Sequence, residues 1–333
     1  MSIEQYSVVP SVAWQPFPMS APLQRYALNE ATMGTRYSAI FFAAAGLDTT
    51  PIADALQAAV DEVDNQMSTW KPASDLSRVN AAPVGQWVEI PHDLANVLAA
   101  SLEIGRASGG AFHIGVGDLV NAWGFGPTGA QPHTARIAEL AAQPRSAMDD
   151  MLDLDAAGGR VRKRAPVTLD LSGIAKGFGV DQLARCLDGF GIAHYLVGID
   201  GEMRASGHKP GGGPWVLAVE QPDQAARDVA RLIKVTDCAI ATSGDYRHRV
   251  EMDGHTASHT MDPASGRPLS NNLASVTVLA ADCMHADAWA TALMVLGDIE
   301  GPAFAARRGM DALFIVRDGN GFRELAVGAF RQG

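Results

Sequence analysis

Short apolar segments separated only by turns recur through the second half of the chain, and they constrain the fold more than any other sequence feature. Such segments are typical of strands that pair with their neighbours in hairpins. We predict strands at residues 195–199, 203–206, 215–219, 235–242, 249–252, 274–280, 313–317 and 325–329. Hairpins and meanders therefore outnumber βαβ units. This favours an α+β fold with largely antiparallel sheets flanked by helices over a doubly wound parallel sheet.

The first half of the chain mixes helical and strand-like patterns. Apolar residues spaced three and four apart indicate amphipathic helices, and the pair Gly109-Gly110 marks the end of one of them. Helices are predicted at residues 50–67, 92–108, 134–143 and, most strongly apolar, 284–296. Two further strand pairs are predicted, 25–28 with 35–42 around a bend at Met33-Gly34, and 152–154 with 160–162.

The first 24 residues contain four prolines and predict an irregular N-terminal arm. A chain of 333 residues is long enough for two domains or one large one. We expect a single large domain at residues 25–333, built either as one unit or as two intertwined subdomains. The arm lacks the pattern of a secretory signal, and no run reaches the roughly 18 apolar residues that span a bilayer. The expectation is a cytoplasmic protein without a transmembrane segment, or a periplasmic one if a signal was removed.

The formal net charge of -11 argues against a nucleic-acid partner, because binding a polyanion requires a basic surface. It leaves open a small anion held through a metal ion. The three cysteines, Cys186, Cys238 and Cys283, are far apart in sequence and lack metal-knuckle spacing. We expect them to be buried thiols that act as small hydrophobes.

Residues 170–181 read Asp-Leu-Ser-Gly-Ile-Ala-Lys-Gly-Phe-Gly-Val-Asp and combine features of a metal–phosphate site. We predict a strand at 167–171, a small-residue turn, and a helix at 180–187. Small residues let a ligand approach the backbone, N–H groups at the helix start attract anions, and Lys176 adds a mobile positive charge. The alternative is an ordinary strand-to-helix connection that carries a surface lysine.

Asp287 and Thr291 lie four residues apart in the predicted apolar helix, so their oxygens share one face. A carboxylate, a hydroxyl and a backbone carbonyl are hard oxygen ligands that magnesium accepts, with phosphate and water completing its shell. In the alternative interpretation, Asp287 complements the helix dipole and Thr291 is a packed core hydroxyl.

His259 follows a predicted strand, in the sequence Ser-His-Thr-Met-Asp-Pro. A histidine here could take a proton from an incoming hydroxyl, although a loop histidine with a structural hydrogen bond is the more common outcome. Trp70 and the corner at 123–125 could stack on a flat heterocycle or simply pack against neighbouring loops.

Taken in chain order, these segments resemble the ApbE family, the FAD:protein FMN transferases. The resemblance runs from Met33 to about Gly297. Its motifs lie at residues 33–35, 67–70, 108–112, 123–126, 170–181, 200–207, 241–246, 258–266 and 286–293. Each motif alone is modest evidence for the family, whereas the occurrence of these motifs in the same order as in the family is specific evidence.

The resemblance implies that FAD lies in a cleft with its diphosphate on Mg²⁺. Asp287, Thr291 and the carbonyl of Gly173 would then be the metal ligands, and His259 would be the catalytic base. Positions that match FAD contacts in the family are Met33, Trp70, Ala111, Phe112, His113, Asp170, Lys176 and Met261.

By the same resemblance, the activity would be Mg²⁺-dependent transfer of FMN from FAD to a Ser or Thr hydroxyl of an acceptor flavoprotein, with release of AMP. The acceptor would carry a flavinylation motif. The alternatives are an FAD pyrophosphatase that forms FMN and AMP, and a non-catalytic FAD-binding or storage protein. His113 departs from the family pattern, which usually has Asp after Ala-Phe, and this departure bears on the FAD contacts of that loop. Family members are commonly exported or lipid-anchored.

Overall fold

An antiparallel sheet of eight strands forms the centre of the protein. The computed structural model describes residues 23–129, 131–142, 145–222, 228–245, 249–252, 255–319 and 321–332. The sheet order is β1-β2-β6-β7-β10-β15-β16-β17, and every neighbouring pair is antiparallel. The strands are β1 (Leu23–Thr32), β2 (Thr35–Ala44), β6 (Tyr195–Ile199), β7 (Glu202–Ser206), β10 (Cys238–Gly244), β15 (Leu273–Ala280), β16 (Asp311–Asp318) and β17 (Gly321–Val327). The predicted α+β fold with largely antiparallel sheets is confirmed.

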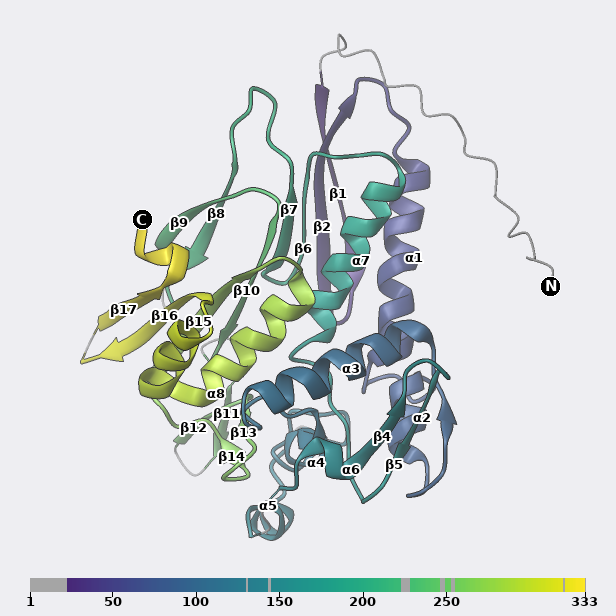
Figure 1. Ribbon diagram of the computed structural model, residues 1–333, viewed down its shortest axis with the longest axis vertical. Helices are drawn as coiled ribbons and strands as arrows, with labels where there is room; N and C mark the ends of the chain where they lie inside the picture. Colours follow the sequence, from purple (N-terminus) through teal and green to yellow (C-terminus); the bar gives the residue numbers. More distant parts are fainter. Residues whose placement is uncertain are drawn as a thin grey trace, which may run out of the picture.

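Three helices cover one face of this sheet, α1 (Thr50–Met67), α7 (Ala175–Gly189) and α8 (Cys283–Arg307), with α7 and α8 packed against each other (Figure 1). Successive side chains of a strand point to opposite faces. In β6, Tyr195 and Val197 therefore join the core under α1 and α7, while Leu196 belongs to the core on the other face. Along this face α7 packs on β6 and β7, and α8 packs on β10 and β15.

The other face is covered by a separate two-stranded ribbon, β8 (Trp215–Glu220) paired with β9 (Val229–Val235). Buried side chains alternate along β8, so Trp215 and Leu217 point inward and pack with Leu196 and Ile315 of the large sheet. The far end of β8 reaches the cavity described below.

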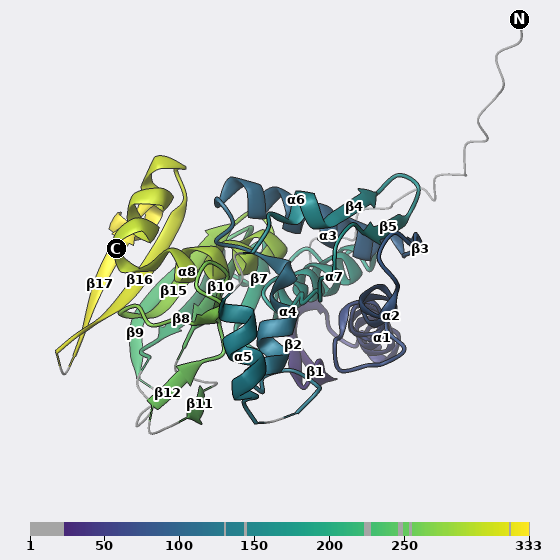
Figure 2. The same ribbon diagram turned by 90° about the horizontal axis from the view of Figure 1, so that it is seen from below.

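Short helices and a small sheet form a lobe next to α1 and α7, as Figure 2 shows. Its elements are α2 (Asp75–Ala81), β3 (Val88–Glu89), α3 (His92–Ala107), η1 (Ile114–Val116), α4 (Gly117–Ala122), α5 (Thr134–Ala141), α6 (Met148–Met151), β4 (Leu152–Asp155) and β5 (Arg160–Lys163). The core of the lobe also includes Ala288 and Ala292 of α8. Residues of α1 and α7 also belong to this core, so the lobe and the sheet layer share all three helices, and a division into two subdomains stays a prediction.

Helix positions and the two early hairpins follow the sequence patterns closely. The bend at Met33-Gly34 joins β1 to β2, and both residues have positive φ, 46° and 73°. The last predicted helix is longer than its apolar pattern, since α8 continues to Arg307 through an irregular residue, Gly297, with φ 81°. Smaller elements complete the chain: β11 (Arg249–Met252), β12 (His255–Ser258), β13 (Met261–Asp262), β14 (Arg267–Pro268) and η2 (Gly328–Gln332).

The predicted strand at 167–171 and the helix start at 180 are wrong. The segment before α7 is extended but forms no strand, and α7 begins at Ala175. Its backbone groups are satisfied elsewhere: Asp170 N–H donates to the Ile114 carbonyl (2.8 Å), and Leu169 N–H donates to Asn80 Oδ1 (2.7 Å). A carbonyl of η1 and the side chain of Asn80 in α2 replace a neighbouring strand here.

Two other expectations need correction. The predicted strand at 235–242 is the end of β9 and the start of β10, because the backbone turns at Asp237, with φ 49°. The three cysteines are free, but only Cys283 is fully buried.

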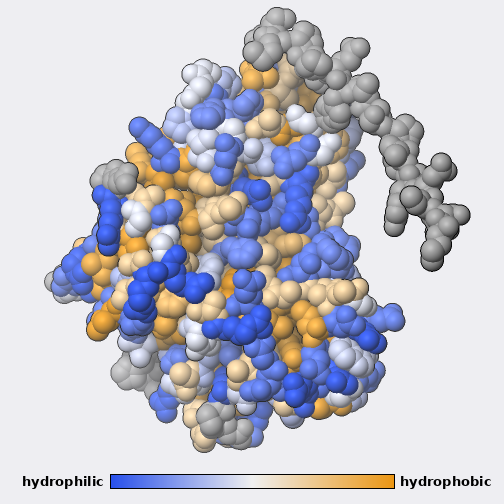
Figure 3. All heavy atoms as spheres, in the orientation of Figure 1, coloured by the Kyte–Doolittle hydropathy of each residue, from blue (hydrophilic) through white to orange (hydrophobic). Residues whose placement is uncertain are grey.

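The surface carries hydrophilic and hydrophobic residues intermixed on the face seen in Figure 3. Within the described ranges, no helix combines the length and the apolar character needed to cross a bilayer. Of the predicted N-terminal arm, residues 1–22 lie outside the described residues, while Leu23 and Gln24 already belong to β1.

Candidate active site

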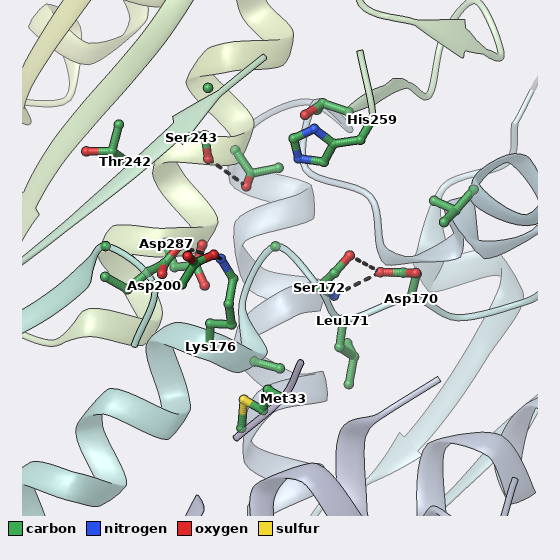
Figure 4. Close-up of a pocket in the computed structure, with 18 of the residues that line it drawn as sticks. Met33, Asp170, Leu171, Ser172, Lys176, Asp200, Thr242, Ser243, His259 and Asp287 are labelled. Carbon is green, nitrogen blue, oxygen red and sulfur yellow. Dashed lines mark hydrogen bonds and ion pairs between the residues drawn. The ribbon is translucent and has the colours of Figure 1, made fainter. Parts of the chain in front are cut away.

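A cavity of about 1000 Å³ opens between the sheet layer and the helical lobe. Segments far apart in sequence form its walls, including the β1–β2 bend, the loop after α1, the start of α7 and one face of α8. All twelve residues singled out from the sequence line it: Met33, Trp70, Ala111, Phe112, His113, Asp170, Gly173, Lys176, His259, Met261, Asp287 and Thr291. Figure 4 shows several of them pointing toward a common space.

The close approach of α7 to α8 builds one end of the cavity. A Cβ atom on Gly177 would lie 2.3 Å from the Cys283 carbonyl oxygen and 2.8 Å from Asp287 Cβ, so the helices meet where only glycine fits. At this contact the Gly177 N–H donates to Asp287 Oδ2 over 3.0 Å. The free N–H of the first turn of α7 thus holds the carboxylate of α8 in place.

Asp287 is a strongly perturbed carboxyl group, with only 4% of its surface exposed. Burial and, to a smaller extent, the nearby Glu202 carboxylate raise its pKa, the Lys176 ammonium and the Gly177 N–H oppose the rise, and the net result is a pKa of about 7. An additional positive charge at this position would stabilise the ionised form.

Thr291 lies one helical turn beyond Asp287 and completes a group of oxygen donors. Its hydroxyl pairs with the hydroxyl of Ser243 over 3.1 Å (Figure 4). Gly173 faces it so closely that a Cβ there would lie 3.0 Å from Thr291 Oγ1. The structure therefore brings together the three residues expected to bind a metal.

The chemistry of these donors fits Mg²⁺, which prefers carboxylate, carbonyl and hydroxyl oxygens and retains waters or phosphate oxygens. Among the residues that the structure describes, no three His, Cys, Asp or Glu side chains converge into a metal site of their own. A cation beside Asp287 would thus depend on neutral protein oxygens and on the phosphates of a bound ligand.

Lys176 is held in an ion-pair cluster rather than extended into solvent. Its ammonium donates to Glu202 Oε1 over 2.9 Å and to Asp200 Oδ2 over 3.5 Å. Burial alone would lower the pKa of Lys176, but the carboxylates of Glu202, Asp287 and Asp200 together raise it above its ordinary value. In the structure the ammonium is thus paired with two carboxylates, and the mobile charge expected from the sequence stays a prediction.

Asp170 stabilises the turn that leads into α7. Its Oδ1 accepts a hydrogen bond from the Ser172 N–H over 2.8 Å and a second from the Ser172 hydroxyl (Figure 4). An aspartate that bonds the backbone two residues ahead is a common turn motif. The turn presents the backbone of Ser172 and Gly173 to the cavity.

His113 serves the fold of its loop through both ring nitrogens. Nδ1 accepts from the Gly115 N–H over 3.1 Å, so Nε2 carries the proton and donates to the Ser146 carbonyl over 3.0 Å. Burial lowers the pKa of His113, which keeps the ring neutral. The adjacent Phe112 is buried in the lobe core and forms part of the cavity floor.

Aromatic and histidine side chains also line the cavity. The His259 ring lies edge-on to Phe125 with ring centroids 6.4 Å apart. Met261 is buried against Leu119 and Trp123, whereas Trp70 is 66% exposed at the rim.

Comparisons with known proteins decide the family. The sequence profile of the ApbE family matches residues 33–314. This chain belongs to the ApbE family. The FAD:protein FMN transferase of Vibrio cholerae is 38% identical over 312 residues, which cover 93% of each protein. That of Salmonella typhimurium is 35% identical over 303 residues, covering 89% of this chain and 85% of the relative.

Solved structures of ApbE proteins share the same fold. The flavin transferase ApbE from Vibrio cholerae matches with a TM-score of 0.84 and 36% identity, over 93% of this chain and 99% of the other. The Pseudomonas stutzeri flavinyl transferase ApbE in its apo form gives a TM-score of 0.83, also at 36% identity, over 93% and 96%.

The ApbE motifs also contain residues that our prediction of the site omitted. Glu202 and Asp200 lie in the motif at 200–207, and Ser243 lies in the motif at 241–246. Asp181 ends the motif at 170–181, where it accepts from the Cys283 and Met284 N–H groups and pairs with Arg204. Asp181 therefore caps α8 one turn before Asp287. Their positions inside family motifs could have identified these residues as candidates. A motif does not reveal, however, which side chains contact one another in the folded chain.

Proposed function

We propose that this ApbE protein transfers FMN from FAD to a Ser or Thr hydroxyl of an acceptor flavoprotein, in a Mg²⁺-dependent reaction that releases AMP. One observation carries the proposal. The oxygen donors of Gly173, Asp287 and Thr291 lie beside Lys176 in a single cavity that His259 also lines. The relatives most similar in sequence that we compared are named FAD:protein FMN transferase.

The size and lining of the cavity suit a dinucleotide. Ligand sites typically have volumes of roughly 300–1000 Å³, and this cavity lies at the upper end, at about 1000 Å³. Charged groups such as Asp287 and Lys176 line it together with apolar and aromatic side chains such as Phe112 and Met261. A ligand with a charged diphosphate between two flat ring systems matches this distribution of side chains.

The proposed chemistry forms a bond between the acceptor oxygen and the phosphorus of the FMN half, and breaks the bond from that phosphorus to the bridging oxygen. The AMP half leaves with the bridging oxygen. His259 would take the proton from the acceptor hydroxyl. Lys176 would offer a fixed positive charge to the diphosphate. Mg²⁺ held by Asp287, Thr291 and the Gly173 carbonyl would supply neutralisation of the charge on the leaving group.

The decisive experiment measures AMP release and covalent flavin fluorescence together. Purified protein is incubated with FAD, with or without Mg²⁺, and with or without a domain that carries a Ser/Thr flavinylation motif. We expect metal-dependent AMP release together with a fluorescent acceptor. AMP and free FMN regardless of acceptor would identify a pyrophosphatase instead, and intact bound FAD under all conditions would identify a binding or storage protein.

His259→Ala separates binding from chemistry. Because the side chain is proposed to take a proton rather than to hold FAD, this variant is expected to bind FAD normally and to lose transfer by about 10²-fold or more. FAD affinity is measured by quenching of flavin fluorescence. Transfer at the unmodified rate would remove His259 from the role of base.

A further inference from the structure

We propose that Glu202 is a positioning residue that holds the Lys176 ammonium in place for the FAD diphosphate. The inference rests on the function proposed above and deepens it, because it assigns a role to a cavity-lining carboxylate that would act through Lys176.

The contact between these two residues is short and partly buried, because the Lys176 side chain is 29% exposed and that of Glu202 only 6%. Glu202 begins β7 and is 4% exposed, while Lys176 lies in the first turn of α7. Glu202 Oε1 accepts from the ammonium at 2.9 Å. Asp200 is a weaker partner, because its oxygen is 3.5 Å away and its side chain is 34% exposed, against 6% for Glu202. The Lys176–Glu202 pair therefore sets the position of the ammonium.

The second carboxylate oxygen of Glu202 indicates that moving Lys176 away from Glu202 would destabilise the folded protein. Glu202 Oε2 is buried and has no hydrogen-bond partner among the described residues. If the ammonium moved away to a phosphate, both carboxylate oxygens would be buried and unpaired. Removing one partner of a buried ion pair is strongly destabilising. We infer that Lys176 stays on Glu202 while FAD is bound.

A fixed ammonium still has a donor to offer. Lysine carries three N–H donors, and two of them face Glu202 and Asp200. Lys176 lines the cavity together with Asp287, so the remaining donor is available to a phosphate oxygen there. A charge held in position before the substrate binds stabilises a developing charge without reorganisation. Glu202 would thus contribute to the rate through Lys176 and little to FAD affinity.

The test is a double-mutant cycle with Lys176→Met, Glu202→Gln and the double variant. Glu324→Gln is the matched control, because Glu324 also forms an ion pair of 2.9 Å, with Arg231, but does not line the cavity. Initial rates of FMN transfer give kcat and the KM for FAD, and urea unfolding gives the midpoint of each variant.

We expect Glu202→Gln to lower kcat about 10-fold while the KM for FAD stays within about twofold. In the Lys176→Met background the same substitution should change kcat by less than about twofold, since Glu202 acts through the missing ammonium. Lys176→Met alone should lower the urea midpoint, and adding Glu202→Gln should raise it again by about 0.5 M or more, because it removes the unpaired buried charge. Glu324→Gln should leave kcat unchanged.

Equal losses of kcat on substituting Glu202 with and without Lys176 would overturn the proposal, as would a loss of the same size in Glu324→Gln. An unchanged kcat in Glu202→Gln would also overturn it. Absence of FMN transfer in the unmodified protein would refute the function instead. In that case the unfolding cycle still tests the pair: a double variant no more stable than Lys176→Met would show that Lys176 does not stabilise Glu202.

Discussion

Gly177, in the first turn of α7, has no space for a side chain. In Gly177→Ala the new Cβ would lie 2.3 Å from the Cys283 carbonyl oxygen, and an ordinary contact begins at 3.4 Å. The helices α7 and α8 must therefore separate by roughly 1 Å at this point, because the obstructing atoms are backbone and cannot rotate away. Overpacking of this kind costs about 1–3 kcal/mol in the free energy of unfolding.

The same displacement would affect the chemistry. The hydrogen bond from the Gly177 N–H to Asp287 Oδ2, now 3.0 Å, would lengthen beyond a useful distance. Asp287 would then lose its orientation relative to Thr291 and Gly173. A misplacement of about 1 Å in an active site can cost about 10²-fold in rate. We expect Gly177→Ala to lower kcat for FMN transfer by this order.

Urea unfolding and the Mg²⁺ dependence of transfer provide the assay. Gly189→Ala is the control on the same helix, because no atom lies within 4 Å of its Cβ position. Alanine in a helix is favoured over glycine by up to about 1 kcal/mol, so this control should be neutral or stabilising. A Gly177→Ala protein with an unchanged urea midpoint and an unchanged half-saturating Mg²⁺ concentration would refute the reasoning.

Three further substitutions test other parts of the site. His113→Asn keeps an acceptor for the Gly115 N–H. Because burial lowers the pKa of His113 below that of the unfolded chain, the unmodified protein should lose stability relative to this variant as the pH falls below about 6.5, as followed by urea midpoints at pH 7.5 and about 5.5. Asp181→Ala leaves Arg204 and the N–H groups of Cys283 and Met284 without their carboxylate and should cost about 3 kcal/mol or more in urea unfolding; a loss below about 1 kcal/mol would contradict the capping role. Thr291→Val removes one oxygen donor and should raise the half-saturating Mg²⁺ concentration about 10-fold, whereas unchanged metal dependence would exclude Thr291 as a ligand.

Sequence periodicity predicted those helices and strands whose pattern of buried residues lies within a single segment of the chain. The alternation of β8 and the helical spacing of α1 and α3 are visible in single segments, because burial of one face repeats with the period of the element. The segment at 167–171 has the composition of a strand but lacks a strand beside it. Its partners, Asn80 and Ile114, are far away in the sequence, so composition could not reveal them.

The identity of the candidate residues came from ordered motifs, and all twelve line one cavity. The residues adjacent to them in the sequence did not reveal which hydrogen bonds and contacts hold their side chains in position. The family resemblance marked His113 as a departure, and the structure shows its ring bonded to the Gly115 N–H and the Ser146 carbonyl.

The sequence by itself determined the antiparallel α+β architecture, the family and the side chains available for chemistry, because periodicity and motif order are local or additive properties. Only the tertiary structure decided that Lys176 is fixed by Glu202, 26 residues away, and that Gly177 holds Asp287, 110 residues away. Such contacts depend on how β7, α7 and α8 pack together. Packing is settled by the whole chain at once, since each buried charge needs a partner and each close approach needs a residue small enough to allow it.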